Sequence, residues 1–311
     1  MLKKPFLFVL CALFALALPL SSLSACAERP TAALSNTTAG ETTTDPDLAT
    51  SKGLAMSLSA DGTYYIVAGI GACTDTSIRI PYRHNGIPVK EIGGGAFLQN
   101  TALKSVTLSP EIVRIDDSAF YRCTSLKSVT FAAGLNEIGE NAFGGCTALT
   151  ALSIPDTVTR IADYAFSECA ALTELQIPDS VTALGSRAFF GCTALTRAVL
   201  GNGITEIASS AFASCSALSE LRLGNAVTCI AENAFSGTAI ATVALPITVM
   251  RVESGAFRNC HDLKTVTYPG TRAELLQASF AQDWCKGAPE SAVAVLCTDG
   301  AQAVGVAVPR P

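Results

Sequence analysis

Many of the twelve cysteines in this 311-residue chain recur at a fixed interval, which raises the question of a metal site or disulfides. Six fall at one position of a repeated frame, with Thr238 interrupting their series: Cys123, Cys146, Cys169, Cys192, Cys215 and Cys260. A metal site needs thiolates that converge at about 2.3 Å from the ion, and a disulfide needs Cβ atoms about 3.8 Å apart. Side chains standing parallel on successive turns of a stack satisfy neither condition. We therefore expect this cysteine column to act as small buried hydrophobes, with no metal and no cofactor.

Four further cysteines lie outside the column, namely Cys73, Cys229, Cys285 and Cys297. A disulfide between the last two is one interpretation, and free thiols are the other. Free thiols in an exported protein indicate either thorough burial or a low-oxygen habitat.

Only two histidines are present as candidate general bases. A nucleophile needs a base beside it, yet His261 directly follows Cys260, and neighbouring side chains on an extended or turning backbone point apart. His84 lies in the turn-like stretch YRHNG. The sequence also lacks Gly-x-Ser-x-Gly, a phosphate-binding glycine loop and Cys-x-x-Cys. We expect no catalytic residues and no enzyme.

An internal repeat determines the elements that position these residues. An Ala-Phe pair recurs every 23 residues, with a last interval of 22, and its phenylalanines are Phe97, Phe120, Phe143, Phe166, Phe189, Phe212, Phe235 and Phe257. Aliphatic columns keep the same register, so that one period is roughly L-x-x-V-x-L-P-x-x-V-x-x-I-x-x-x-A-F-x-x-C-x. This length and core fit leucine-rich repeats. Because no period buries its apolar side alone, the periods must stack.

Each period predicts two short extended segments and a corner. In LTELQI the alternation places Leu175 and Ile177 inside, with Glu174 and Gln176 outside, and VTRI gives the second segment. Prolines, which do not donate into a ladder, end the first segment in several periods: Pro155, Pro178 and Pro246. ADYAF and GENAF predict a brief helical turn at the corner.

The expected fold class is an α/β-type but β-rich repeat solenoid, a right-handed leucine-rich repeat coil. About eight turns of 23 residues, with short parallel strands and short helical turns, are capped at both ends. The usual strand spacing gives a stack about 40 Å long.

The repeated frame resembles the BspA-like leucine-rich repeat family of bacterial surface proteins, over about residues 54–300. GLAMSLSADGTYYIV resembles that family's N-terminal cap, and TYPGTRAELLQASFAQDW with VLCTDG resembles its closing unit. The expected organisation is a cap at residues 51–80, repeats at 81–268, and a cap with tail at 269–311. The resemblance implies adhesion to host or bacterial partners.

The N-terminus predicts export. Lys3 and Lys4 precede an apolar run that is shorter than a membrane span of about 20 residues. The following LSAC resembles the bacterial lipobox, so we expect residues 1–26 to be a signal peptide and Cys26 to carry a lipid at the surface of a bacterial membrane. An ordinary signal peptide and a secreted protein are the alternative. Residues 27–50 are rich in Thr, Ala and Ser and predict a flexible tether.

The charge pattern argues against two classes of partner. The net charge is −5 and no run of Lys or Arg occurs, whereas nucleic acids and anionic membranes need clustered positive charge. We expect no nucleic acid, and membrane contact through the lipid anchor only.

Side chains that differ between turns are the candidates for recognition. On the outer face of the first extended segment they are charged: Lys104, Lys127, Glu174, Arg197, Glu220 and Arg222. Tyr121 and Phe190 are exposed-aromatic candidates for a protein contact. The alternating Arg114, Glu137 and Arg160, and a threonine column beside them, are expected to be structural. The strand face lacks an aromatic stripe, which disfavours sugar or base stacking there.

These observations favour a surface-anchored repeat protein that presents a rigid face to an extracellular or cell-surface protein, in adhesion or another host or bacterial interaction. The alternative is a cell-envelope spacer without a specific ligand, which the small and evenly polar strand face supports. An exported enzyme is less favoured, because the chain has no domain outside the repeats that is long enough to house a site.

Overall fold

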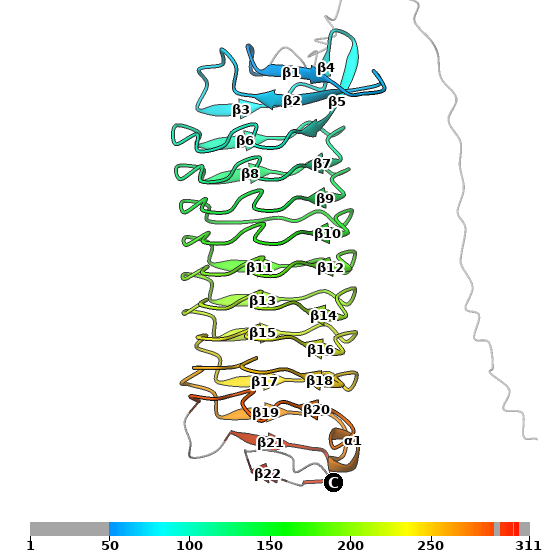
Figure 1. Ribbon diagram of the computed structural model, residues 1–311, viewed down its shortest axis with the longest axis vertical. Coiled ribbons are helices and arrows are strands. Elements are labelled where there is room, and N and C mark those ends of the chain that lie inside the picture. The colour runs from blue at the N-terminus through cyan, green and yellow to red at the C-terminus, as the bar shows by residue number, and fades with distance from the viewer. Residues whose placement is uncertain (1–49, 289–292, 301, 305–311) are drawn as a thin grey trace, which may run out of the picture. The chain divides into compact units, whose positions relative to one another are not determined.

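The computed structural model describes residues 50–288, 293–300 and 302–304, so the expected signal peptide, Cys26 and nearly all of the tether lie outside the described residues. The described residues form a β-solenoid of about nine stacked turns of roughly 23 residues, built mostly from parallel strands (Figure 1). The sequence predicted about eight turns. The additional turn comes from the C-terminal segment, whose Trp284 packs edge-on against Phe257 with ring centroids 5.8 Å apart.

The first extended segment of the period forms one column of short strands. Its members are β3 (Ser77–Arg79), β6 (Ser105–Thr107), β8 (Ser128–Thr130), β11 (Glu174–Gln176), β13 (Arg197–Val199), β15 (Glu220–Arg222), β17 (Thr242–Ala244), β19 (Thr265–Thr267) and β21 (Ala294–Leu296). Paired neighbours are parallel and in register, so that Glu174 lies opposite Arg197 and Arg197 opposite Glu220. The predicted alternation is confirmed in β11, where Leu175 is buried between two exposed neighbours.

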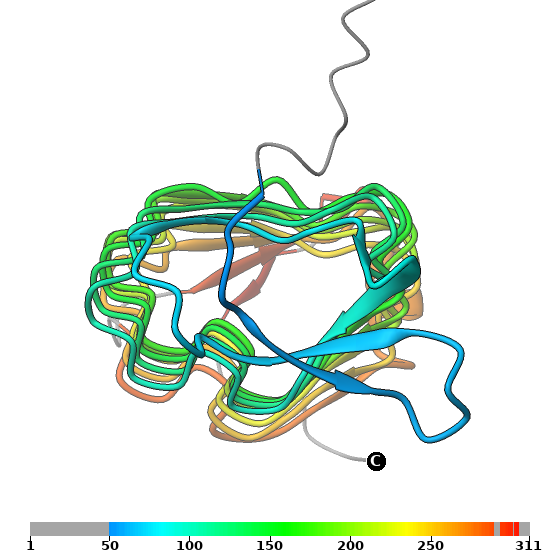
Figure 2. The same ribbon diagram turned by 90° about the horizontal axis from the view of Figure 1, so that it is seen from above.

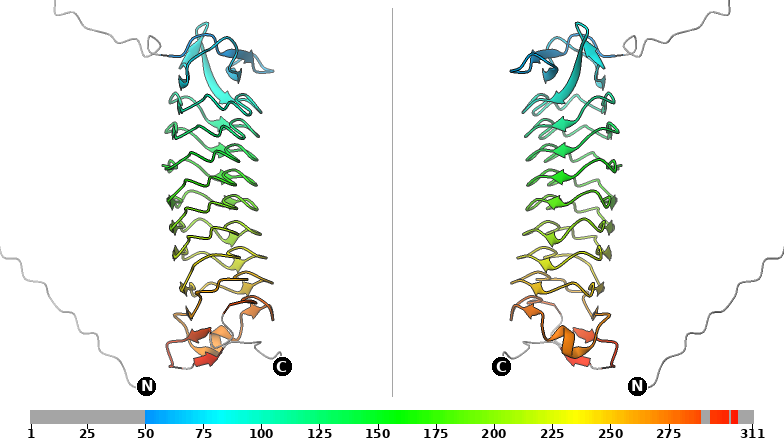
Figure 3. Two further views of the ribbon diagram at one scale, coloured as in Figure 1. Left: turned by 90° about the vertical axis from the view of Figure 1, so that its left-hand side faces the viewer. Right: turned by 90° about the vertical axis from the view of Figure 1, so that its right-hand side faces the viewer.

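The second extended segment forms another column of strands, most of them two residues long. Its members are β5 (Ile87–Ile92), β7 (Arg114–Ile115), β9 (Glu137–Ile138), β10 (Arg160–Ile161), β12 (Ala183–Leu184), β14 (Glu206–Ile207), β16 (Cys229–Ile230), β18 (Arg251–Val252) and β20 (Ser279–Phe280). Seen from above, successive turns superpose closely (Figure 2), and the side views show strands stacked one over another (Figure 3). Residues at one position of the period therefore form columns along the stack.

Other elements lie at the two ends of the stack. At the first end, β1 (Ala55–Leu58) pairs antiparallel with β2 (Tyr65–Gly69), and β4 (Arg83–His84) pairs antiparallel with β5. At the other end, the short helix α1 (Arg272–Leu275) precedes β20, and β22 (Gln302–Val304) pairs antiparallel with β21. Among the described residues, no helix has the length and apolar character to span a membrane.

The corner of each period is a run of turns, whereas the sequence predicted a brief helical turn; α1 is the only helix in the described part of the chain. Two residues of each Ala-Phe corner adopt the left-handed region, for example Asn141 (φ 53°) before Ala-Phe and Gly145 (φ 72°) after it. Left-handed residues interrupt a right-handed helical path. Alternate N–H groups instead donate to the next turn, as from Phe143 N to Ala165 O at 2.7 Å. Hydrogen bonds between turns thus replace those of a helix.

The phenylalanine column forms the centre of the core. Neighbouring rings from Phe97 to Phe257 are stacked, with centroids 5.0 to 5.5 Å apart. Each ring is at most 1% exposed, and the aliphatic columns of the repeat surround it. Stability is therefore a sum of contacts between adjacent turns. The apolar side chains of the repeated frame are buried in the core.

Candidate functional site

The cysteine column lies inside this core, and none of its six members has exposed surface. Its thiols donate to phenylalanine carbonyls of the preceding turn, as from Cys123 Sγ to Phe97 O at 3.0 Å and from Cys215 Sγ to Phe189 O at 3.1 Å. Burial raises the pKa of the Cys123 thiol to about 11 and that of Cys169 to about 12. Because the thiolate is the reactive and metal-binding form, the raised pKa keeps Cys123 and Cys169 in the unreactive thiol form. The interpretation as small buried hydrophobes is confirmed.

The four cysteines outside the column that the structure describes are also free thiols, with Cys73 and Cys229 buried and Cys285 and Cys297 half-buried. The disulfide interpretation for the last two is therefore wrong. Cys285 lies at a corner directly after Trp284, whereas Cys297 follows β21 in the first strand column. The two thiols thus belong to different columns of the stack.

The structure places the two histidines in different surroundings. Cys260 is fully buried while the neighbouring His261 is exposed, so the two side chains point apart as expected. His84 lies in β4 and packs edge-on against Tyr65, with ring centroids 4.7 Å apart. Within the described ranges, no group of three or more His, Cys, Asp and Glu side chains is placed to hold a metal ion.

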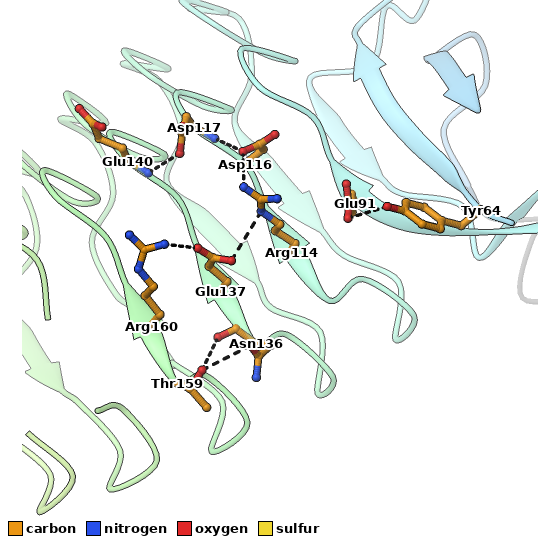
Figure 4. A network of polar contacts seen from close by, with 10 residues as sticks. All are labelled: Tyr64, Glu91, Arg114, Asp116, Asp117, Asn136, Glu137, Glu140, Thr159 and Arg160. Carbon is orange, nitrogen blue, oxygen red and sulfur yellow. Dashed lines mark hydrogen bonds and ion pairs between the residues drawn. The ribbon is translucent and has the colours of Figure 1, made fainter. Parts of the chain in front are cut away.

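A ladder of charges runs along the second strand column (Figure 4). Glu137 Oε2 lies 3.6 Å from Arg114 Nε, and Glu137 Oε1 lies 2.5 Å from Arg160 Nη1, so opposite charges alternate on successive turns. Arg114 also contacts Asp116, at 2.9 Å. These side chains are partly exposed, and such ion pairs each contribute about 0–1 kcal/mol. The ladder joins adjacent turns, which is the structural role expected of it.

The threonine column beside this ladder has the same role. Thr159 Oγ1 lies 3.3 Å from Asn136 Oδ1 (Figure 4), and Thr228 Oγ1 donates to Thr205 O at 3.0 Å. These bonds run from one turn to the turn before it, so they hold the stack in register.

The charged candidates of the strand face all lie at the first strand column, but in two groups. Lys104 and Lys127 directly precede β6 and β8 on adjacent turns. The other group lies further along the stack, in β11, β13 and β15: Glu174, Arg197, Glu220 and Arg222. In that group Arg197 Nε lies 3.4 Å from Glu220 Oε2, so part of its charge is paired. The structure therefore gives one face with two separate charged regions.

The structure brings Tyr121 and Phe190 together in one pocket of about 350 Å³ at the corners of the turns. Both directly follow a core phenylalanine, three turns apart, a separation of roughly 15 Å at the usual strand spacing. The two turns between them carry Gly144 and Ser167 at that position. The Tyr121 ring lies against the glycine, where a Cβ would be 3.1 Å from Tyr121 Cδ2. Small residues in the intervening turns thus create the hollow between two aromatic side chains.

The sequence reasoning missed the other residues that line this corner pocket: Arg122, Asn141, Tyr164, Ser167, Glu168 and Arg187. The Arg122 guanidinium carbon lies 5.3 Å from the ring centroid of Tyr121, and that of Arg187 lies 5.4 Å from the ring of Tyr164. Arg187 also donates to the Tyr164 hydroxyl. These residues could have been found in the sequence from the positions that flank Ala-Phe, because aromatic and arginine side chains occur there in adjacent turns.

Five of the lining residues have left-handed backbone, with φ between 53° and 58°: Arg122, Asn141, Tyr164, Glu168 and Arg187. Other turns place glycine at the same positions, for example Gly95 and Gly237. A left-handed conformation costs about 1–2 kcal/mol for most non-glycine residues. The corner pocket therefore carries long side chains at positions where glycine has the lower backbone energy.

A second hollow of about 320 Å³ lies on the second strand column. It forms where Ala183 stands between Arg160 and Glu206 and interrupts the ladder of charges. Its lining consists of aliphatic, small and polar residues without an aromatic ring, and its Arg160 is engaged with Glu137. The corner pocket adds aromatic rings, which this second hollow lacks, to its polar and charged groups.

Comparison with known proteins agrees with this architecture. A family model described as a BspA type leucine rich repeat region, with six copies, matches residues 73–196 and 159–286. A leucine-rich repeat protein of T. pallidum (TpLRR) is 29% identical, with a TM-score of 0.53, over 55% of this chain and 79% of that chain. A leucine-rich repeat protein from Bacteroides ovatus ATCC 8483 shares the fold, with 19% identity and a TM-score of 0.56 over 79% of this chain and 70% of that one. A search among curated proteins gives no match. The family model covers more than half of the sequence, and the chain belongs to the BspA-type leucine-rich repeat family.

Proposed function

We propose that this chain is an exported bacterial surface protein whose solenoid recognises another protein at the cell surface or outside it, as in adhesion. The observation that carries the proposal is the corner pocket, in which Tyr121, Tyr164 and Phe190 lie with Arg122 and Arg187. Tyrosine and arginine are enriched among the residues that dominate the affinity of protein interfaces. Repeat solenoids typically serve as non-enzymatic binding scaffolds, and we propose no catalytic role.

The stacked core supports this proposal because it makes the surface rigid. Rings in the phenylalanine column lie within 5.5 Å of one another, and the turns are joined by backbone hydrogen bonds at every corner. A preorganised surface loses little conformational entropy on binding. The exposed side chains vary from turn to turn on this fixed frame, so specificity can reside in them without a change of fold.

The strand-face charges form the second part of the proposal. Lys104, Lys127, Glu220 and Arg222 are exposed, and no aromatic anchor stands among them in the first strand column. Exposed charges at the rim of an interface act mainly on the association rate and on its salt dependence. We assign the strand-face charges to steering and the corner aromatics to affinity.

Surface attachment through Cys26 completes the proposal. BspA-like leucine-rich repeat proteins are typically bacterial surface or exported proteins, and LSAC at residues 23–26 resembles a lipobox. A flexible tether of residues 27–50 reaches roughly 25–30 Å as a random coil, which would present the solenoid above the membrane.

The structural spacer remains the second candidate, and the strand face favours it. Its outward positions are small or weakly polar on many turns, including Thr130, Ser153 and Ala244. Such a face offers few anchors for a partner. The two functions differ in one observable property, which is saturable binding.

The test is binding of the full-length protein, in detergent micelles, to arrayed extracellular-matrix and bacterial surface proteins. A corner variant carries Tyr121→Ala with Phe190→Ala, and the matched control Leu98→Ala changes the same position of the period in a turn outside the pocket. The proposal predicts a saturable partner whose affinity falls at least tenfold in the corner variant and stays unchanged in the control. A folded protein without saturable binding would contradict the proposal and favour the spacer.

A further inference from the structure

We infer that the corner pocket binds a segment of a partner protein that presents an aromatic side chain next to a carboxylate. This inference rests on the proposed function and adds the chemistry of the partner. It follows from how the rings, the two guanidinium groups and the single acid are arranged.

The apolar part of the pocket fits one aromatic side chain. Tyr121 and Phe190 stand at its two ends along the stack, and Tyr164 lines it from the intervening turns. Between them Ser167 leaves space because its side chain is short. A volume of about 350 Å³ accommodates a ring with its flanking backbone. Aromatic pairs prefer offset or edge-on contacts, which rings placed around a hollow can make.

The charged part of the pocket fits a carboxylate. Arg122 and Arg187 each lie over a tyrosine ring, at 5.3 and 5.4 Å, and both side chains are exposed. Stacking occupies the face of a guanidinium group and leaves the N–H groups at its edge for acceptors. Arg187 gives one of these N–H groups to the Tyr164 hydroxyl. None of the ion pairs within the described residues involves either arginine. Carboxylates are the planar acceptors in proteins that match this fork in two bonds.

Glu168 is the single acid in the lining, and its position indicates where the carboxylate binds. Its side chain leans toward the next turn, because a Cβ on Gly191 would lie 3.6 Å from Glu168 Cγ. Arg187 lies with Tyr164 on the other flank of Ser167 in the period. A carboxylate on the flank of Arg187 contacts that guanidinium group and stays away from Glu168. Glu168→Gln should therefore strengthen the binding of acidic ligands.

The backbone holds two of these side chains at left-handed positions of the corner. Tyr164 and Arg187 have φ of 56° and 55°, at a position where the terminal turns carry Gly95 and Gly255. The hydrogen bonds between turns impose this left-handed backbone at the corners. Ring and guanidinium group at these two positions stack on each other, whereas Ser118 and Ser210, which do not line the pocket, are left-handed at the same position of their turns.

The lining favours a peptide over a neutral sugar. Arginine has no acceptor atom. Arg122 and Arg187 can therefore donate to a hydroxyl oxygen but cannot accept the hydrogen bond that the hydroxyl donates. The acceptors in the lining are the carboxylate of Glu168, the amide oxygen of Asn141 and the hydroxyl groups of Ser167, Tyr121 and Tyr164. A carboxylate, which only accepts, suits the donor-only guanidinium group of either arginine.

The experiment measures short blocked peptides against the full-length protein by saturation-transfer NMR. The probes are acetyl-Asp-Phe-Asp-amide, acetyl-Ala-Phe-Ala-amide, acetyl-Asp-Ala-Asp-amide and acetyl-Lys-Phe-Lys-amide, with cellotriose as the carbohydrate probe. We expect the first peptide to bind at least tenfold more tightly than each of the other peptides and than cellotriose. Equal binding of the lysine peptide, tighter binding of cellotriose, or no binding of any probe at millimolar concentration would overturn the inference.

Variants separate the two halves of the site. Arg122→Gln with Arg187→Gln should weaken the Asp-Phe-Asp peptide at least tenfold and leave the Ala-Phe-Ala peptide within threefold, whereas Tyr121→Ala with Phe190→Ala should weaken both. Leu98→Ala is the matched control and should change neither. A circular dichroism spectrum equal to that of the parent protein shows that each variant is folded. Loss of peptide discrimination in the control would contradict the assignment to this pocket.

The outcomes also separate this inference from the proposed function. If an arrayed protein binds saturably and the strand-face variant Lys104→Ala with Lys127→Ala abolishes that binding while the corner variant does not, protein recognition stands and the corner pocket is not its site. If no arrayed protein binds but the acidic aromatic peptide does, the pocket chemistry stands and the recognition of a surface protein fails.

Discussion

Truncation of one core phenylalanine in the middle of the stack should reveal how strongly neighbouring turns depend on each other. Phe166 has no exposed surface and its ring lies 5.2 Å from that of Phe143 and 5.3 Å from that of Phe189. Phe166→Ala removes the ring from contact with both neighbours and leaves a cavity that the rigid stack fills poorly. Core Phe→Ala substitutions cost about 3–5 kcal/mol. We expect the free energy of unfolding to fall by about 4 kcal/mol, since two stacked contacts are lost at once.

Urea unfolding followed by circular dichroism measures this loss. Phe190→Ala is the matched control, because Phe190 directly follows the core residue Phe189 but is half-buried at the corner. It should cost less than about 1 kcal/mol, as surface substitutions usually do. Because stability is a sum over neighbouring turns, Phe166→Ala should also broaden the transition as the two halves of the stack uncouple. A loss below about 1 kcal/mol for Phe166→Ala, or equal losses in the two variants, would refute the reasoning.

Three further predictions follow from the thiols and the N-terminus. Burial raises the pKa of Cys123 to about 11 and of Cys169 to about 12, above the ordinary value of 9.0. Between these values the folded state keeps protons that the unfolded state loses, so the free energy of unfolding should fall as the pH rises. We expect full stability below about pH 9 and a loss from there to about pH 12 of up to about 1.4 kcal/mol per pH unit for each thiol. Urea titrations at pH 8 and 10 check this, and equal stability at both values would contradict it. In the folded protein a thiol reagent should modify the half-buried Cys285 and Cys297 first and the cysteine column only after unfolding, as mass spectrometry of the labelled peptides would show; early labelling of the column would contradict its burial. Cys26→Ala should move the protein from the detergent phase to the aqueous phase in a phase-separation assay, because the lipid would be absent, and unchanged partitioning would contradict the anchor.

Strict periodicity made the fold predictable from the sequence. The Ala-Phe pair and the aliphatic columns specify which residues point inward, and the alternation in β11 and the buried cysteine column followed from spacing alone. The alternating charges at Arg114, Glu137 and Arg160 could likewise be placed on successive turns. Where the sequence repeats, one turn predicts the next.

The corner conformation was not predictable in the same way. The alanines of ADYAF and GENAF permit a helical turn, yet hydrogen bonds to the next turn determine the backbone there and require left-handed residues such as Tyr164. Local propensity is a weak guide when partners lie a full turn away. The corner pocket was missed for a related reason: Tyr121 and Phe190 were each visible as exposed aromatics, but their shared hollow depends on Gly144 and Ser167 in the turns between them.

Recognition of a protein through the corner pocket is the central claim, and one titration tests it most directly. The measurement is the dissociation constant of the full-length protein for a saturable partner from the array, compared with those of the Tyr121→Ala, Phe190→Ala variant and of Leu98→Ala. The account predicts at least a tenfold rise for the corner variant and no change for the control. Equal dissociation constants for all three proteins, each shown to be folded, would contradict it.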